Sequence, residues 1–193
     1  WSSTNSVNYA MKKENLTSIA EQLYCSSILE EETAKAYKSY SERAENPLFK
    51  PMLLFIAQDS IKHAKILQSL CKCLSKAPVS KKDCPRILGK AWKEATAFAK
   101  TEAAKPGKLT NQALCSYIDD MISLENVMSE EYLAVLHLKI VQLQTGGMQV
   151  DGCDVQKVLG YIVEDEARHK AILDRIRQLL KQPDAKGAED LNC

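Results

Sequence analysis

Proline and glycine fall mostly in the gaps between long runs of other residues, and this distribution limits what the chain can form. Both residues interrupt helices, so the runs between them mark where helices can extend. The 193-residue chain has only 7 glycines and 6 prolines. Ala, Leu, Lys and Glu dominate, which favours helix. We predict four long helices and one short helix, over about residues 15–44, 48–75, 86–104, 110–144 and 154–181.

The lengths of the links between these runs predict how the helices are arranged. The first two long runs are joined by a short link, and so are the last two, which favours antiparallel helical hairpins. About thirty residues join Ser75 to Thr110, which is enough for one long crossover. We therefore predict an all-α antiparallel four-helix bundle of about residues 15–181, in a single domain of residues 1–193. The short helix of residues 86–104 should lie on the crossover.

Apolar residues recur every three or four positions in each long run, and polar residues interrupt each stripe near its middle. Tyr37 and Tyr132 each follow a single glutamate by two helical turns, and we expect both to be core residues whose hydroxyls bond locally. Packing the four stripes together would bring the polar residues to one level. They are Glu30 in the first run, Ser60 and His63 in the second, Glu125 in the third, and Glu166 and His169 in the last.

The two halves of the chain contain similar segments. "IAQDSIKHAKIL", residues 56–67, matches "IVEDEARHKAIL", residues 162–173, and the Glu30 and Tyr37 pair matches Glu125 and Tyr132. This similarity suggests a duplicated helical hairpin. The polar interruption therefore occurs twice, which a chance pairing of glutamate and histidine would not do.

Three glutamates in buried stripes need compensation, because a carboxylate buried without a partner costs several kcal/mol. No stripe carries a lysine or arginine at that level. Carboxylate and imidazole together suit iron, manganese or zinc, and residues three apart on a helix share one face. Glu166 and His169 could therefore reach one metal ion. A centre of one or two divalent metals is the most economical interpretation.

One glutamate from each of two helices, with Glu-x-x-His from the other two, is the arrangement of di-iron carboxylate bundles. On these residues the chain resembles the ferritin-like, rubrerythrin-type superfamily. The resemblance implies a ferritin-like fold and an iron cofactor, most simply di-iron, with manganese or zinc as alternatives. It also implies that Asp59 and Asp165 hydrogen-bond a ligand histidine from outside the metal site. The implied metal ligands are Glu30, His63, Glu125, Glu166 and His169.

The chain departs from the family pattern at Ser60, where the family has a glutamate. Two divalent ions would then face three carboxylates, which leaves about one uncompensated positive charge. A hydroxide, a bound anion or Asp59 would have to complete the site. We expect the ion position served by Glu166 and His169 to bind metal more tightly than the position served by His63.

Two functions of different kinds are compatible with this pattern. The resemblance implies a non-haem di-iron oxidoreductase acting on O2 or peroxide, of peroxidase or ferroxidase type. An external protein would donate electrons, since no pair of CxxC motifs follows the bundle. The alternative is a degenerate bundle with one metal or none in a structural or protein-binding role, which Ser60 favours. A homodimer is compatible with either.

Charge and cysteine content concern partners and location. The chain has 26 basic and 25 acidic residues, which predicts no nucleic-acid partner. No uncharged stretch is long enough to span a membrane, and the first residues lack the features of a signal peptide. We expect a cytoplasmic protein without a membrane partner. The 7 cysteines show no CxxC spacing, and we expect reduced thiols that mostly act as small core residues.

Overall fold

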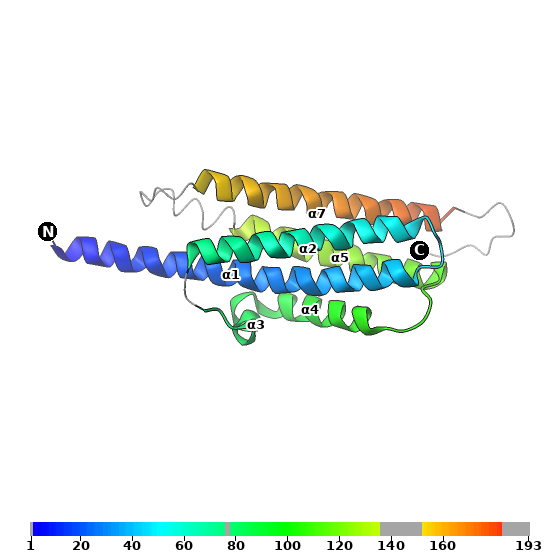
Figure 1. Ribbon diagram of the computed structural model, residues 1–193, viewed down its shortest axis with the longest axis horizontal. Coiled ribbons are helices and arrows are strands. Elements are labelled where there is room, and N and C mark those ends of the chain that lie inside the picture. The colour runs from blue at the N-terminus through cyan, green and yellow to red at the C-terminus, as the bar shows by residue number, and fades with distance from the viewer. Residues whose placement is uncertain (1, 76–77, 136–151, 183–193) are drawn as a thin grey trace.

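Long helices dominate the structure. The computed structural model describes the backbone of residues 2–75, 78–135 and 152–182, and the side chains of residues 16–75, 78–130 and 155–182. The described residues form no strand, and their one β feature is an isolated bridge between Ala44 and Leu109. The predicted all-α class is confirmed. The long helices are α1 (Ser2–Arg43), α2 (Phe49–Leu74), α5 (Asn111–Val135) and α7 (Gly152–Leu180), which lie side by side (Figure 1).

The helices pair as the link lengths predict. α1 packs mainly against α2, and α5 against α7, with further contacts between α2 and α7 and between α1 and α5. α1 and α7 run in one direction, and α2 and α5 run in the other (Figure 1). The long link between α2 and α5 carries η1 (Lys81–Asp83), α3 (Cys84–Ile87) and α4 (Gly89–Ala104). α4 lies along α1 on the side away from α7 (Figure 1).

Several helix boundaries differ from the prediction. α1 begins at Ser2 and not near residue 15, because no proline or glycine precedes Pro47 and nothing in the sequence stops the helix earlier. The predicted helix of residues 86–104 is divided in two at Gly89, whose φ of 78° is readily adopted only by glycine. The end of the predicted 110–144 helix, beyond Val135, lies outside the described residues.

The core consists of two apolar clusters on either side of a polar layer. One contains residues such as Ile19, Leu23 and Leu159, and the other contains residues such as Tyr40 and Leu173. Both follow the stripes predicted from the sequence. The interrupting polar residues lie between them, so the polar layer is enclosed by apolar packing along the helices. No helix in the described part of the chain is long and apolar enough to cross a membrane.

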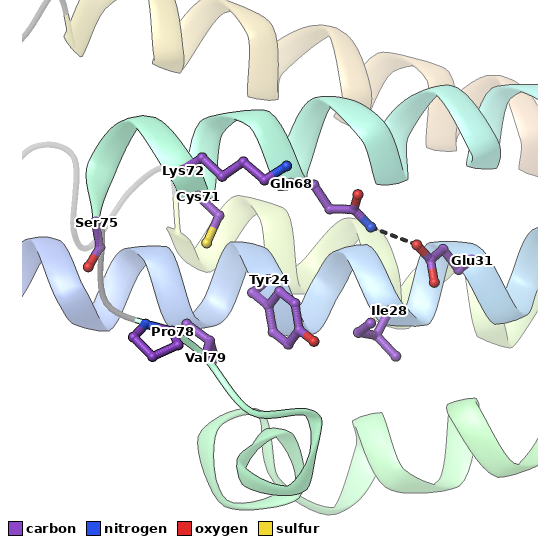
Figure 2. Close-up of a pocket in the computed structure, with 9 residues that line it drawn as sticks. All are labelled: Tyr24, Ile28, Glu31, Gln68, Cys71, Lys72, Ser75, Pro78 and Val79. Carbon is purple, nitrogen blue, oxygen red and sulfur yellow. Dashed lines mark hydrogen bonds between the residues drawn. The ribbon is translucent and has the colours of Figure 1, made fainter.

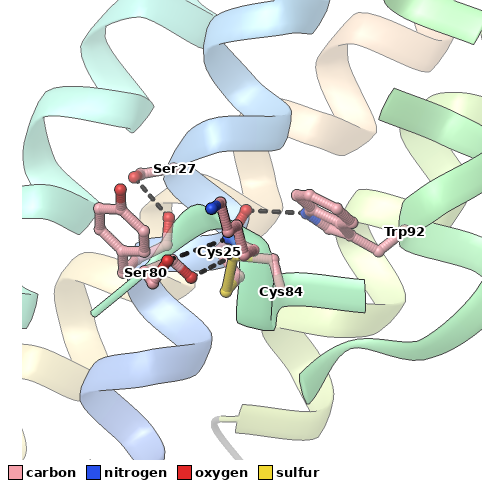
Figure 3. The surroundings of a disulfide bond; sticks show 7 residues. Cys25, Ser27, Ser80, Cys84 and Trp92 are labelled. Carbon is pink, nitrogen blue, oxygen red and sulfur yellow. Dashed lines mark hydrogen bonds between the residues drawn. A yellow bond between two sulfur atoms is a disulfide. The ribbon is translucent and has the colours of Figure 1, made fainter. Parts of the chain in front are cut away.

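A disulfide ties the crossover to α1. Cys25 of α1 is bonded to Cys84 of α3, with their Cα atoms 5.3 Å apart (Figure 3). Beside this bond, Trp92 Nε1 of α4 donates a 2.8 Å hydrogen bond to the carbonyl oxygen of Cys25. Cys115 is also disulfide-bonded, whereas Cys71 and Cys73 are free. The expectation of reduced thiols was therefore wrong for these bonded residues, because packing of the crossover on α1 joins cysteines that are 59 residues apart.

Candidate metal centre

The five predicted metal ligands converge in the polar layer, and all five are buried. They come from the four long helices, with Glu166 and His169 both on α7, and each replaces an apolar residue in a stripe that packs inward. Their donor atoms form two groups, and within each group the atoms lie within 4.8 Å of one another. The first group is Glu30, His63 and Glu166, and the second is Glu125, Glu166 and His169.

Glu166 belongs to both groups and lies between the two histidines. Its Oε1 is 3.1 Å from Nδ1 of His63, and its Oε2 is 3.7 Å from Nδ1 of His169. Glu30 Oε1 lies 3.2 Å from the same nitrogen of His63, and Glu125 Oε2 lies 3.0 Å from that of His169. The imidazole rings are stacked with centroids 5.8 Å apart. Each group thus holds one single glutamate, one histidine nitrogen and one oxygen of a shared carboxylate.

The outer nitrogens of the histidines contact aspartates on the neighbouring helix. His63 Nε2 is 3.0 Å from Asp165 Oδ2, and His169 Nε2 is 3.3 Å from Asp59 Oδ2. The predicted contacts between aspartate and ligand histidine are therefore present, although each aspartate serves the histidine of the other helix. Each aspartate lies one helical turn before the histidine of its own helix. Because α2 and α7 face each other, its carboxylate reaches the histidine of the neighbouring helix.

Two basic residues outside the predicted set complete this outer layer. Lys62 Nζ contacts Asp59 Oδ1 at 2.7 Å and Asp165 Oδ2 at 2.8 Å. Arg168 contacts Asp165 Oδ1 at 2.7 Å. The repeated segments held the signal, since Lys62 and Arg168 each directly precede the histidine and follow the aspartate by three residues. The charges of Asp59 and Asp165 are thus paired with the side chains of Lys62 and Arg168.

Tyr37 extends the network on the other side of the centre. Its ring is in the core, as predicted, and its hydroxyl donates a hydrogen bond to Glu125 Oε1. This bond joins α1 to α5, so it is not the local bond that we expected. The side chain of Tyr132 lies outside the described residues.

Burial and mutual contacts shift the pKa values of three of the ligand residues. Burial, together with the charges of Glu30 and Glu125, raises the pKa of Glu166. Burial lowers the pKa of His63, but contacts with Glu166 and Glu30 outweigh it and raise the pKa to about 10. For His169, the contact with Glu125 likewise outweighs burial and raises the pKa. We therefore expect a cation that binds here to displace protons.

The surroundings of the Glu166 carboxylate are those of a metal ligand. Both of its oxygens are buried, and neither accepts a well-formed hydrogen bond from a described residue. A buried carboxylate without donors is costly, and each of these oxygens lies near a histidine nitrogen that can also bind a cation. The set of three carboxylates and two imidazoles suits iron, manganese or zinc. Each donor group could therefore hold a metal ion, and Glu166 would contribute to both groups.

Ser60 is the one member of the polar layer without a ligand group of its own. It is fully buried on the face of α2 that carries His63, and its hydroxyl has no hydrogen-bond partner among the described residues. The structure nevertheless gives both groups the same three donor types. The tighter binding that we expect at the position of Glu166 and His169 stays a prediction.

The pocket drawn in Figure 2 does not belong to this centre. It has a volume of about 670 Å³ and lies between α1, α2 and the start of the crossover. None of the residues predicted for the metal site lines it. Its Gln68 side chain donates to Glu31 Oε1 across the two helices (Figure 2).

Comparison of the chain with protein-family models, with curated proteins and with solved structures gives no match.

Replacing Asp165 by asparagine is expected to weaken metal binding about 10–100-fold, because the charge that orients and polarises His63 is lost. Titration of chelator-treated protein with Co²⁺, followed by visible absorption, would measure the change. Asp174→Asn is the matched control, since Asp174 lies on the same helix and pairs with Arg177 away from the centre. Equal affinities in the two variants would show that the contact with His63 does not support a metal ligand.

Proposed function

We propose that the chain is a two-metal carboxylate protein of ferritin-like, rubrerythrin type that uses iron to reduce O2 or peroxide. The observation that carries this proposal is the Glu166 carboxylate, which is buried between two histidines and flanked by Glu30 and Glu125. An external protein would supply the electrons. Manganese or zinc would fit the same donors.

The arrangement of the helices supports this proposal. The long helices form two hairpins joined by one long crossover, and this is the connectivity of ferritin-like bundles. The contacts are also mirrored between the halves, since each histidine has a single glutamate on its inner side and an aspartate on its outer side. Such repetition is expected of a paired centre and not of a single buried ion pair.

Two ferrous ions would supply the reducing electrons, and the residues around them would set the conditions for the reaction. With a cation bound, the Nε2–H of each histidine would donate to its aspartate, and Nδ1 would give up its proton to bind the cation. Tyr37 holds a proton at its hydroxyl, directly on Glu125. The apolar clusters on both sides limit access of water, so the electrostatic effect of each charged group is strong.

The alternative is a bundle that has lost its site and acts through its surface. Ser60 favours it, because its buried hydroxyl has no partner in the described part of the chain and stands at a position where a glutamate would serve as a ligand. The presence of two glutamates and one histidine in each donor group, with Glu166 in both, favours the two-metal proposal. The number of bound ions separates the two.

Anaerobic titration of the chelator-treated protein with ferrous iron should give two ions per chain and a release of protons. The reduced, loaded protein should then consume peroxide or O2 faster than the same concentration of free iron. Isothermal calorimetry in two buffers of different ionisation enthalpy would count the released protons. A stoichiometry of one or zero would support the structural alternative and contradict the oxidoreductase.

A further inference from the structure

Ser60 occupies a position from which a longer side chain would reach the centre. In the repeated segments it matches Glu166, and each of the two residues precedes its histidine by three positions. The contacts around His63 and His169 repeat in the same way. Since Glu166 reaches both histidines from α7, the equivalent position on α2 faces the same centre from the opposite helix.

What the chain lacks at this position is the carboxylate itself. The hydroxyl of serine lies where the second methylene of a glutamate side chain would be, so the missing part is close to a formate ion in size. The hydroxyl is fully buried and has no partner among the described residues. A buried hydroxyl without a partner is uncommon, and it can donate a hydrogen bond to an oxyanion beside it.

The charges of the centre also call for an anion. Two divalent cations bring four positive charges, whereas Glu30, Glu125 and Glu166 bring three negative ones. The outer layer does not correct this, because Asp59 and Asp165 are paired with Lys62 and Arg168. One net positive charge would therefore stay in a layer enclosed by apolar residues.

Asp59 cannot supply the missing carboxylate from its observed position. Its Oδ2 contacts His169 Nε2, which points away from Glu125 and Glu166, and its Oδ1 contacts Lys62. Movement to the inner side of the ring would break both contacts. Of the three ways to complete the site, a hydroxide and a bound anion therefore remain, and the hydroxyl of Ser60 can donate to either.

We infer that a small carboxylate anion binds beside Ser60 and serves as the fourth carboxylate of the two-cation centre. This inference rests on the proposed function, since the anion is held by the cations and by the Ser60 hydroxyl together. A site that takes its fourth carboxylate from solution can also take it from a substrate. The substrates of this centre would then include small carboxylic acids, with the carboxylate anchored beside Ser60.

The test uses Co²⁺ as the metal and formate as the anion. Chelator-treated protein is titrated with Co²⁺ at constant ionic strength, in chloride alone and in chloride with formate. We expect formate to tighten uptake of the second ion at least 10-fold and to change the visible absorption of the bound Co²⁺. Binding of ¹³C-labelled formate to the zinc-loaded protein, followed by NMR, measures the anion directly.

Variants at position 60 locate the effect. Ser60→Glu should bind two ions without formate and lose the response, whereas Ser60→Ala should keep a weaker response because only the hydroxyl donor is gone. Ser41→Ala is the matched control, since the buried Ser41 hydroxyl donates to the carbonyl oxygen of Lys50 away from the centre.

If the parent binds two ions with no effect of formate and no bound ¹³C-formate, a hydroxide completes the site and the inference is wrong. An equal response in Ser60→Glu would also overturn it. Failure of the parent to bind two ions would overturn the proposed function as well, so the two failures are distinguishable.

Discussion

Replacing Glu166 by glutamine is expected to abolish tight metal binding at both positions. Among the described residues, Glu166 is the one shared by the two donor groups. Its replacement by glutamine exchanges one carboxylate oxygen for an NH2 group that cannot bind a cation and removes the negative charge that both groups share. The loss should exceed the roughly 10–100-fold effect of a residue that merely supports a ligand. Metal analysis and Co²⁺ titration of the variant and the parent would show the loss, from two ions per chain to none retained after gel filtration.

The metal-free Glu166→Gln variant should fold as well as the parent or better. Burial and the neighbouring carboxylates raise the pKa of Glu166, so a neutral amide of the same size removes an unfavourable charge. Thermal unfolding without metal would check this. Glu164→Gln is the matched control on the same helix, because Glu164 is exposed and should leave metal binding unchanged. Retention of two tightly bound ions by Glu166→Gln would show that Glu166 does not bridge a metal pair.

Removal of the Cys25–Cys84 disulfide is expected to produce the largest loss of stability. The bond closes a loop across a sequence separation of 59 residues. For a loop of that size, the lost restraint on the unfolded chain corresponds to about 4 kcal/mol in the free energy of unfolding. Urea unfolding of the Cys25→Ala/Cys84→Ala double variant, compared with the parent, would measure it.

Cys73→Ala provides the control, because Cys73 is an exposed free thiol. It should change the free energy of unfolding by less than about 0.5 kcal/mol. The hydrogen bond from Trp92 to the carbonyl of Cys25 is retained in the double variant, so α4 should stay on α1 in its folded state. A double variant as stable as Cys73→Ala would indicate that packing of the crossover alone determines stability here.

Much of the candidate centre could be predicted because its residues interrupt strong patterns. Glu30, His63, Glu125, Glu166 and His169 stand at buried positions of otherwise apolar helical stripes, and a stripe fixes which side chains face inward. The repeat of the His63 segment around His169 made the interruption more than a coincidence. Helix starts were less predictable, since the sequence before residue 15 has no apolar stripe and yet contains nothing that ends α1.

Partners across helices could not be predicted from one sequence. The sequence places Asp59 nearest to His63, yet in the packed structure Asp59 contacts His169. The reason is that the depth and rotation of neighbouring helices depend on all of their contacts together. The same holds for Lys62, which reaches two aspartates on different helices. The disulfide also depends on the path of the crossover over α1. The spacing of Cys25 and Cys84 in the sequence does not indicate that path.

The sequence by itself determined the helical class, the residues that face inward and the composition of the polar layer, because these follow from the period of the helix and from the cost of burying polar groups. Only the tertiary structure decided how that layer is connected. It places Glu166 between both histidines, holds Asp59 on the outer side of His169 and leaves the hydroxyl of Ser60 without a partner among the side chains that the structure describes. These are distances between side chains on different helices, and they are set when the helices pack and not by the order of residues along any one of them.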